Sequence, residues 1–194
     1  MQHTHTLSVI AIFTSLIIAS DFALAPVLNV KIMDTIVFAT AFVFGFRVGA
    51  SIAVLSEFIW SVVTPYGMFL PITPFLVAGE LLFAIAGYIA SKIWGMEKIS
   101  LLSSRNLFIG ATMAICAFIW DFETNIATGL IALWPHQTPF RLLAYEVSGI
   151  FFAIPHELSD FILGAALAPI IIAYCKRLAM TTSDREALVR QEVA

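Results

Sequence analysis

Charged residues are scarce in this sequence. Only 12% of the 194 residues are Asp, Glu, Lys or Arg, whereas 60% are hydrophobic, including 17 phenylalanines; soluble domains carry roughly 25% charged residues. A water-soluble fold of this size could not bury so much apolar surface, but a bilayer hides about 20 apolar residues per spanning helix. The net charge of −3 and the lack of a basic tract argue against nucleic acid as a partner. The composition therefore indicates a single domain embedded in a lipid bilayer.

Cysteines and catalytic motifs are also nearly missing. Cys116 and Cys175 lie far apart in apolar runs without CxxC or metal-type spacing, so we expect inert core thiols. The sequence has no GxxxxGK[ST] phosphate-binding loop, so we expect no ATP hydrolysis by this chain. The stretch HELSD differs from the zinc-protease motif HExxH because Asp160 replaces the second histidine. The sequence therefore assigns no catalytic residue, metal ligand or cofactor.

Apolar windows bounded by Pro, Gly and charged residues predict six membrane-spanning helices. These windows cover residues 7–25, 32–45, 47–64, 74–92, 105–133 and 155–177. The first window lacks a preceding Lys or Arg and is followed by Pro26, so we interpret it as a retained helix rather than a cleaved signal peptide. Pro155 suits the first turn of the sixth helix, which leaves residues 140–154 as a semi-buried outer segment whose placement is re-entrant, interfacial or spanning. The fold class is all-α: a polytopic bundle of six transmembrane helices within residues 1–178, with a short polar tail at residues 179–194.

The basic residues predict the orientation of these helices. With the N-terminus inside, the outer side receives only Lys31 and Arg141. The cytoplasmic side receives Arg47, Lys92, Lys98, Arg105, Lys176, Arg177, Arg185 and Arg190. Because cytoplasmic loops carry the excess of Lys and Arg, both termini are expected in the cytoplasm. The expected location is the plasma membrane.

Seven carboxylates interrupt the apolar windows, and this orientation places all of them in the outer halves of their helices. They are Asp21, Glu57, Glu80, Asp121, Glu123, Glu157 and Asp160. An ionisable group in hydrocarbon costs several kcal/mol unless it faces a wet cavity or a partner. The pattern predicts a polar chamber open to the outside above an apolar floor, which fits a capture site better than a through-pore. Alternatively, some of these groups serve as hydrogen-bonded contacts between helices.

Several polar side chains share helix faces. Asp121 and Asn125 are four residues apart, as are His156 and Asp160. An aromatic side chain beside a carboxylate can stack on a flat ligand while the acid binds its polar edge. The proline-rich linker at residues 64–74 could cover such a pocket, although Tyr66 and Trp134 also suit an interfacial aromatic belt. The candidate substrate-binding residues are Glu57, Trp60, Tyr66, Glu80, Trp120, Asp121, Asn125, His156 and Asp160.

The first helix carries a second candidate surface, formed by small residues at every fourth position: Ala11, Ser15, Ala19 and Ala23. Such a small-residue face lets another helix approach closely. The partner is either a neighbouring helix of the same bundle or a separate membrane subunit.

The whole membrane region, residues 7–177, resembles the substrate-binding S components of energy-coupling-factor (ECF) vitamin transporters. The features that carry the resemblance are the six-helix plan, the small-residue face of the first helix, the run NVKIMDTIVFATAFVFGFRVGA, the PYG loop followed by GE, and the segments DFETNIATGL and PHELSD. Metal-type members place a His directly after the initiator Met, where this chain has Gln2. The resemblance implies capture of a vitamin or related micronutrient from outside. It also implies docking through the first helix to a transmembrane coupling subunit that is driven by cytoplasmic ATPase subunits.

The substrate class remains open within this resemblance. Where relatives often carry Asn after Ser in the last helix, this chain has Asp160, which favours a substrate with a positive or donor-rich group. Two other function classes are also compatible with the residues. One is a stand-alone proton- or cation-coupled transporter, and the other is an intramembrane enzyme using His156, Glu157 and Asp121.

Overall fold

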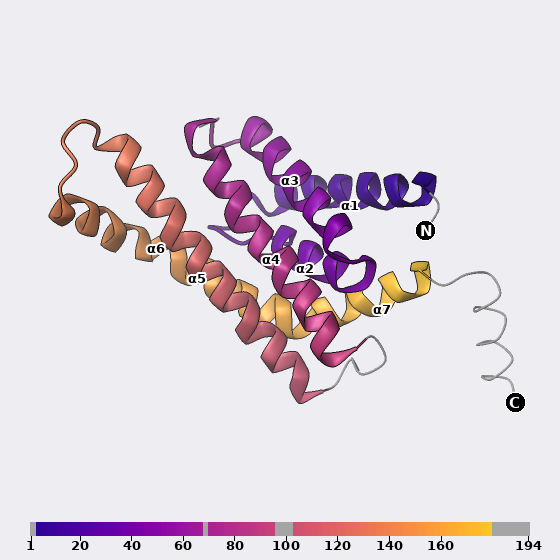
Figure 1. Cartoon of the computed structure of the whole chain (residues 1–194). Helices are drawn as coiled ribbons and strands as arrows, with labels where there is room; N and C mark the ends of the chain where they lie inside the picture. Colours follow the sequence, from indigo (N-terminus) through magenta and orange to yellow (C-terminus); the bar gives the residue numbers. More distant parts are fainter. Residues whose placement is uncertain (1–2, 68–69, 96–102, 180–194) are drawn as a thin grey trace, which may run out of the picture.

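The computed structural model describes residues 3–67, 70–95 and 103–179 (Figure 1). Its elements are α1 (His3–Leu24), α2 (Met33–Phe44), α3 (Phe46–Val63), the 3₁₀ turn η1 (Leu70–Ile72), α4 (Thr73–Trp94), α5 (Ser104–Ala132), α6 (Pro139–Ala166) and α7 (Ala168–Ala179). Within those ranges there is no strand. The all-α prediction is therefore confirmed, and the predicted tail at residues 179–194 lies almost wholly outside the described residues.

Four of the described helices are long and apolar enough to cross a bilayer: α1, α3, α4 (with η1) and α5. The pair α6 and α7 would make a fifth span if taken together, with a bend of 49° between them. Helix α2 has only 12 residues, which is about 18 Å at 1.5 Å per residue and short of the roughly 30 Å hydrocarbon core. The helix lengths thus support a membrane protein with four or five full spans, compared with the six predicted.

The C-terminal boundaries differ from the prediction. Residues 140–154 are helical and belong to α6, which starts with Pro139 in its first turn and continues through Pro155. The prediction that Pro155 begins a helix is therefore wrong. Because Pro155 has no backbone N–H, it cannot donate the helical hydrogen bond to the Phe151 carbonyl. The carbonyl of the next residue, Phe152, accepts a hydrogen bond from Asn29 Nδ2 at 2.8 Å. The predicted sixth span instead breaks at Leu167, just before Pro169, whose missing N–H interrupts the helical ladder.

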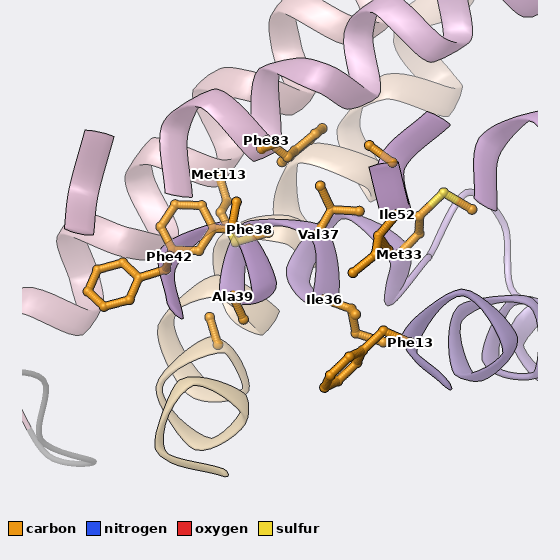
Figure 2. Packing of buried hydrophobic residues seen from close by; sticks show 14 of the residues in the cluster. Phe13, Met33, Ile36, Val37, Phe38, Ala39, Phe42, Ile52, Phe83 and Met113 are labelled. Carbon is orange, nitrogen blue, oxygen red and sulfur yellow. The ribbon is translucent and has the colours of Figure 1, made fainter. Parts of the chain in front are cut away.

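Helix α2 lies at the centre of the bundle. Every residue from Met33 to Phe42 is buried, and the helix contacts α1, α3, α4, α6 and α7. Figure 2 shows its apolar side chains packed against Phe83 and Met113. A helix that is apolar nearly all round and this short is stable only when other helices surround it.

Two glycines let neighbouring helices approach α2 closely. A Cβ on Gly49 of α3 would lie 2.4 Å from the Cβ of Ala41, and a Cβ on Gly87 of α4 would lie 2.2 Å from the carbonyl oxygen of Phe38. Either contact is too short for a real side chain, so both positions need glycine in this packing.

The remaining helices are arranged around this core. Helices α5 and α6 run side by side and extend beyond the other helices at the upper left of Figure 1. The start of α1 and the end of α7 lie on the same side of the molecule, at the right of that view. The ends of α1 and α3 and the start of α4 come together at a cavity, which is the candidate site.

Candidate functional site

The main cavity has a volume of about 470 Å³. It is bounded by the end of α1, the α1–α2 connection, the end of α3, η1 and the beginning of α4, and by the second half of α5 with Phe152 of α6. The connection from Ala25 to Lys31 is irregular backbone and lines the cavity. Non-helical backbone at membrane depth is tolerated where it lines such a cavity, because its polar groups can then be solvated.

The nine predicted substrate-binding residues divide into two groups. Those that line the cavity are Trp60, Tyr66, Trp120, Asp121 and Asn125. Those that do not line it are Glu57, Glu80, His156 and Asp160, each with 0% of its surface exposed. The structure therefore separates the predicted set into a cavity wall and a fully buried polar cluster.

His156 links the wall to the buried cluster. Its Nδ1 lies 3.0 Å from Oδ2 of Asp121, which lines the cavity. Its Nε2 lies 3.3 Å from Oδ2 of Asp34 and 3.9 Å from Oδ2 of Asp160. The helical spacing of four residues predicted that His156 and Asp160 share a face, and in the structure this face points at α2 and α5.

Trp120 separates the cavity from His156. The indole ring packs edge-on against the imidazole, with 5.2 Å between ring centroids, and its Nε1–H donates to the Leu76 carbonyl at 3.2 Å. On the cavity side, the Lys31 ammonium lies 4.7 Å from the indole centroid. Gly79 of α4 permits this packing, because a Cβ there would lie 2.2 Å from Cδ1 of Trp120. Trp120 is thus held by contacts with three neighbouring groups and forms an aromatic wall of the cavity.

Lys31 and Asp34 are site residues that the sequence analysis missed. Lys31 was assigned to an outer loop on the basis of its charge, but it lines the cavity. Burial lowers the pKa of an ammonium, yet the nearby carboxylates of Glu57, Asp34 and Asp21 outweigh burial, so the pKa of Lys31 is raised and the group stays charged. Asp34 lies in the first turn of α2, where an acidic residue is an ordinary helix-start signal. Asp34 lies inside the predicted window at residues 32–45 and was left out of the seven carboxylates, so its position in an apolar window was the signal that could have identified it.

Two further buried carboxylates adjoin Asp34. The carboxyl groups of Glu80 and Asp160 interact with it, and neither oxygen of either group accepts a hydrogen bond from the described residues. Glu57 is nearby on α3 and is 3.5 Å from the Ser61 hydroxyl. Counting Asp21, Asp34, Glu57, Glu80, Asp121 and Asp160, the region holds six carboxyl groups. In the described part of the chain, Lys31 and His156 are the basic groups within this cluster, so its formal charge is strongly negative unless protons or cations are bound.

The other predicted carboxylates do not line this cavity. Glu157 lines a smaller cavity of about 230 Å³ between α5 and α6, together with Glu146. Glu123 faces α4, where a Cβ on Gly79 would lie 2.8 Å from its Oε1. The prediction that all seven carboxylates line one chamber is therefore wrong for Glu123 and Glu157.

Two surface predictions also have a place in the structure. Tyr66 lines the cavity, and its hydroxyl donates to the Ala25 carbonyl, so it joins the cavity rim to the α1–α2 connection. Trp134 is 78% exposed, as an interfacial aromatic residue would be. The small-residue face of α1, consisting of Ala11, Ser15, Ala19 and Ala23, is exposed along its whole length, so no described helix of the bundle covers it.

Comparisons with known proteins find no match for this chain among protein-family models, curated proteins or solved structures. The resemblance to ECF S components therefore stays a prediction that depends on the sequence motifs.

Proposed function

We propose that this chain is the membrane-embedded substrate-binding subunit of an ECF-type transporter in the plasma membrane. In this role it captures a vitamin or related micronutrient from outside, and ATP hydrolysis by partner subunits drives import. The observation that carries the proposal is the cavity of about 470 Å³ at one end of a helical bundle. Beyond Asp34, the core along α2 is mainly apolar, with buried side chains such as Val37, Phe38 and Phe42, and it carries no charged residue as far as Phe44. The predicted chamber was polar, whereas this cavity is lined mainly by apolar residues with a few polar groups such as Asp21, Lys31 and Asp121. A cavity that ends above an apolar core suits capture and not free passage.

The lining of the cavity favours a small organic substrate. Trp60 and Trp120 offer flat aromatic surfaces, and Asp121 and Asn125 offer polar groups that fix orientation. Pockets of a few hundred Å³ with this mixture are typical of small-molecule sites. Two carboxylates, Asp21 and Asp121, and one lysine, Lys31, line the cavity in the described part of the chain, and this balance favours a substrate with a positive or donor-rich group.

The orientation follows from the basic residues. With the start of α1 and the end of α7 in the cytoplasm, the cavity faces outward. These two ends lie on the same side of the molecule (Figure 1), which supports the assignment of both termini to one side of the membrane.

The exposed small-residue face of α1 supports docking to a transmembrane coupling subunit. Because no described helix of this bundle packs on it, a close-packed helix from another chain can occupy it. The sequence has no phosphate-binding loop, so the proposal assigns ATP hydrolysis to cytoplasmic ATPase subunits.

The deciding experiment compares the purified chain in liposomes with and without candidate coupling and ATPase subunits. Native mass spectrometry of gently purified protein identifies the bound molecule, and the same molecule, radiolabelled, is used for uptake. Alone, the chain should bind the molecule without accumulating it, and accumulation should require the partner subunits and ATP. Accumulation driven by a proton or sodium gradient with this chain alone would instead establish a stand-alone transporter.

Asp121→Asn tests the binding site in the same preparation. Removing a charged partner from a dry site costs about 2–5 kcal/mol, so we expect binding to weaken at least tens-fold. Glu123→Gln is the matched control, because Glu123 is on the same helix but does not line the cavity. Normal binding by a folded Asp121→Asn variant would remove Asp121 from the proposed site.

A further inference from the structure

The ligand atoms of Asp34, His156 and Asp160 all lie within 4.8 Å of one another. Nε2 of His156 is 3.3 Å from Oδ2 of Asp34 and 3.9 Å from Oδ2 of Asp160. Two donors that are each about 2.1 Å from one metal ion, at the tetrahedral angle, are about 3.4 Å apart. Each histidine–carboxylate pair is therefore within about 0.5 Å of the separation that one shared ion requires, and the ligand atoms of Asp34 and Asp160 lie within 4.8 Å of each other.

The fourth partner of this arrangement is Asp121. Its Oδ2 lies 3.0 Å from Nδ1 of His156, and an ionised carboxylate can only accept a hydrogen bond, so Nδ1 carries the proton. Without metal, Nε2 is also at hydrogen-bond distance from Oδ2 of Asp34, at 3.3 Å, and donates to it when the imidazole is doubly protonated. A metal ion would replace that proton, and the Nε2 lone pair would then face Asp34 and Asp160. A histidine that donates one ring N–H to a carboxylate while its other nitrogen binds a metal is a recurring second-shell arrangement of metal sites.

An independent observation comes from α4. Glu80 is fully buried, and its carboxyl group interacts with that of Asp34. Neither of its oxygens receives a hydrogen bond from the described residues, and the same holds for both oxygens of Asp160. Buried carboxyl oxygens without a hydrogen-bond partner are costly. A divalent cation placed among these carboxylates would satisfy several of them at once.

We propose that the polar cluster beneath the cavity binds a divalent transition-metal ion through Nε2 of His156 and the carboxylates of Asp34 and Asp160, with Glu80 as an additional oxygen ligand. The imidazole favours Zn²⁺, Fe²⁺, Co²⁺ or Mn²⁺ over Mg²⁺ and Ca²⁺, and the lack of sulfur in the group disfavours Cu⁺. Access runs past Asp121, which lines the cavity and contacts His156. The site does not depend on the proposed transport function.

The test is a titration of the purified full-length chain with Co²⁺, in detergent and without a polyhistidine tag. The chain has four histidines, so replacing His3, His5 and His136 with Ala leaves His156 as its single imidazole. We expect one Co²⁺ per chain, with visible absorption bands of a nitrogen- and oxygen-ligated ion and displacement by Zn²⁺. Because Nε2 must be unprotonated to bind metal, affinity should fall as the pH is lowered.

Variants in this background separate ligands from neighbours. Asp160→Asn should abolish one-to-one binding, and Asp121→Asn should weaken it by about 10–100-fold, because Asp121 positions the imidazole and does not bind the ion. Glu157→Gln is the matched control, since it is adjacent to His156 in sequence but lines a different cavity, and it should bind Co²⁺ normally. Helix content and elution volume identify the variants that fold.

A second measurement requires no variant of the cluster. In protein labelled with ¹⁵N-histidine, adding Zn²⁺ should shift the His156 imidazole signals. A folded chain that binds neither Co²⁺ nor Zn²⁺ at one-to-one stoichiometry, or in which Zn²⁺ leaves these signals unchanged, overturns the proposal. Unaltered binding by a folded Asp160→Asn variant does so as well. Because the metal alone is the probe, a negative result here leaves the transport proposal standing, and a failure of transport leaves this site standing.

Discussion

Replacing Lys31 with Met removes a lysine ammonium from the cavity wall while keeping an unbranched side chain of similar length. In the native protein this ammonium is 4.7 Å from the Trp120 ring centroid. Burial opposes its charge, but the carboxylates of Glu57, Asp34 and Asp21 outweigh burial and raise the pKa of Lys31. The substitution leaves those carboxylates without their shared cation.

The expected loss of stability follows from these contacts. Removing one partner of a fully buried ion pair costs about 3–5 kcal/mol, and Lys31 is only half-buried, so we expect roughly half of that from the carboxylates. Loss of the cation–π contact adds about 1 kcal/mol. A total of about 2–4 kcal/mol corresponds to a lower melting temperature by roughly 5–10 °C for a chain of this size.

Thermal unfolding in detergent, followed by tryptophan fluorescence at pH 5 and pH 8, measures the effect. Protonation of the carboxylates at low pH removes the negative charge that the variant leaves without its cation. The difference in melting temperature between variant and native protein should therefore be larger at pH 8 than at pH 5. Lys92→Met is the control: its ammonium lies 5.1 Å from the Tyr88 ring centroid but on an exposed side chain. It should therefore cost less than about 1 kcal/mol, independent of pH.

A double-mutant cycle tests the cause. If Glu57 and Lys31 interact, Lys31→Met in the Glu57→Gln background should cost measurably less than in the native background. Equal losses for Lys31→Met and Lys92→Met at both pH values would refute the electrostatic account of the cavity wall.

Three further predictions concern packing, docking and the cavity rim. Gly87→Ala should lower the free energy of unfolding by about 1–3 kcal/mol, because the added methyl meets the Phe38 carbonyl oxygen at 2.2 Å; thermal unfolding measures this. Ala19→Trp should abolish partner-dependent uptake while leaving ligand affinity unchanged, because a bulky side chain blocks close helix approach; uptake and calorimetry measure the two. Tyr66→Phe removes the hydrogen bond to the Ala25 carbonyl and should speed ligand release several-fold, consistent with the loss of about 1 kcal/mol; stopped-flow fluorescence measures the rate.

Each of these has a matched control on the same chain. Gly149→Ala should cost less than Gly87→Ala, since the added methyl meets the movable side chain of Asn125 and not a backbone atom. Ile12→Trp, on an exposed part of α1 beside the small-residue face, should leave uptake intact. Loss of ligand binding in Ala19→Trp would show that the face supports the fold and not docking, and an unchanged release rate in Tyr66→Phe would mean that the rim bond is irrelevant to the ligand.

The local composition of the chain was enough to predict its class and the ranges of its first five helices. Hydropathy, proline and glycine act on the chain within a few residues, so the windows at residues 7–25 and 105–133 agree closely with α1 and α5. Helical periodicity also placed His156 and Asp160 on one face. These properties depend on sequence neighbours alone.

Prediction was weakest where two local signals conflicted. Pro155 is a strong helix-start signal, yet α6 continues through it, because its long packing interface with α5 stabilises the helix by more than one lost hydrogen bond costs. Lys31 resembled an ordinary outer-loop lysine, and Asp34 resembled an ordinary helix-start acid. Their sequence neighbours give no indication of the carboxylates that approach them from other helices.

The sequence by itself therefore determined that this protein is an all-helical membrane protein with polar groups toward one end of its helices. Only the tertiary structure decided which polar groups meet. Asp34 on α2 lies beside His156 and Asp160 on α6, and Gly49 and Gly87 let α3 and α4 pack closely around α2. Such contacts join residues more than 120 positions apart, and their formation depends on how whole helices pack, which no local pattern in the sequence specifies.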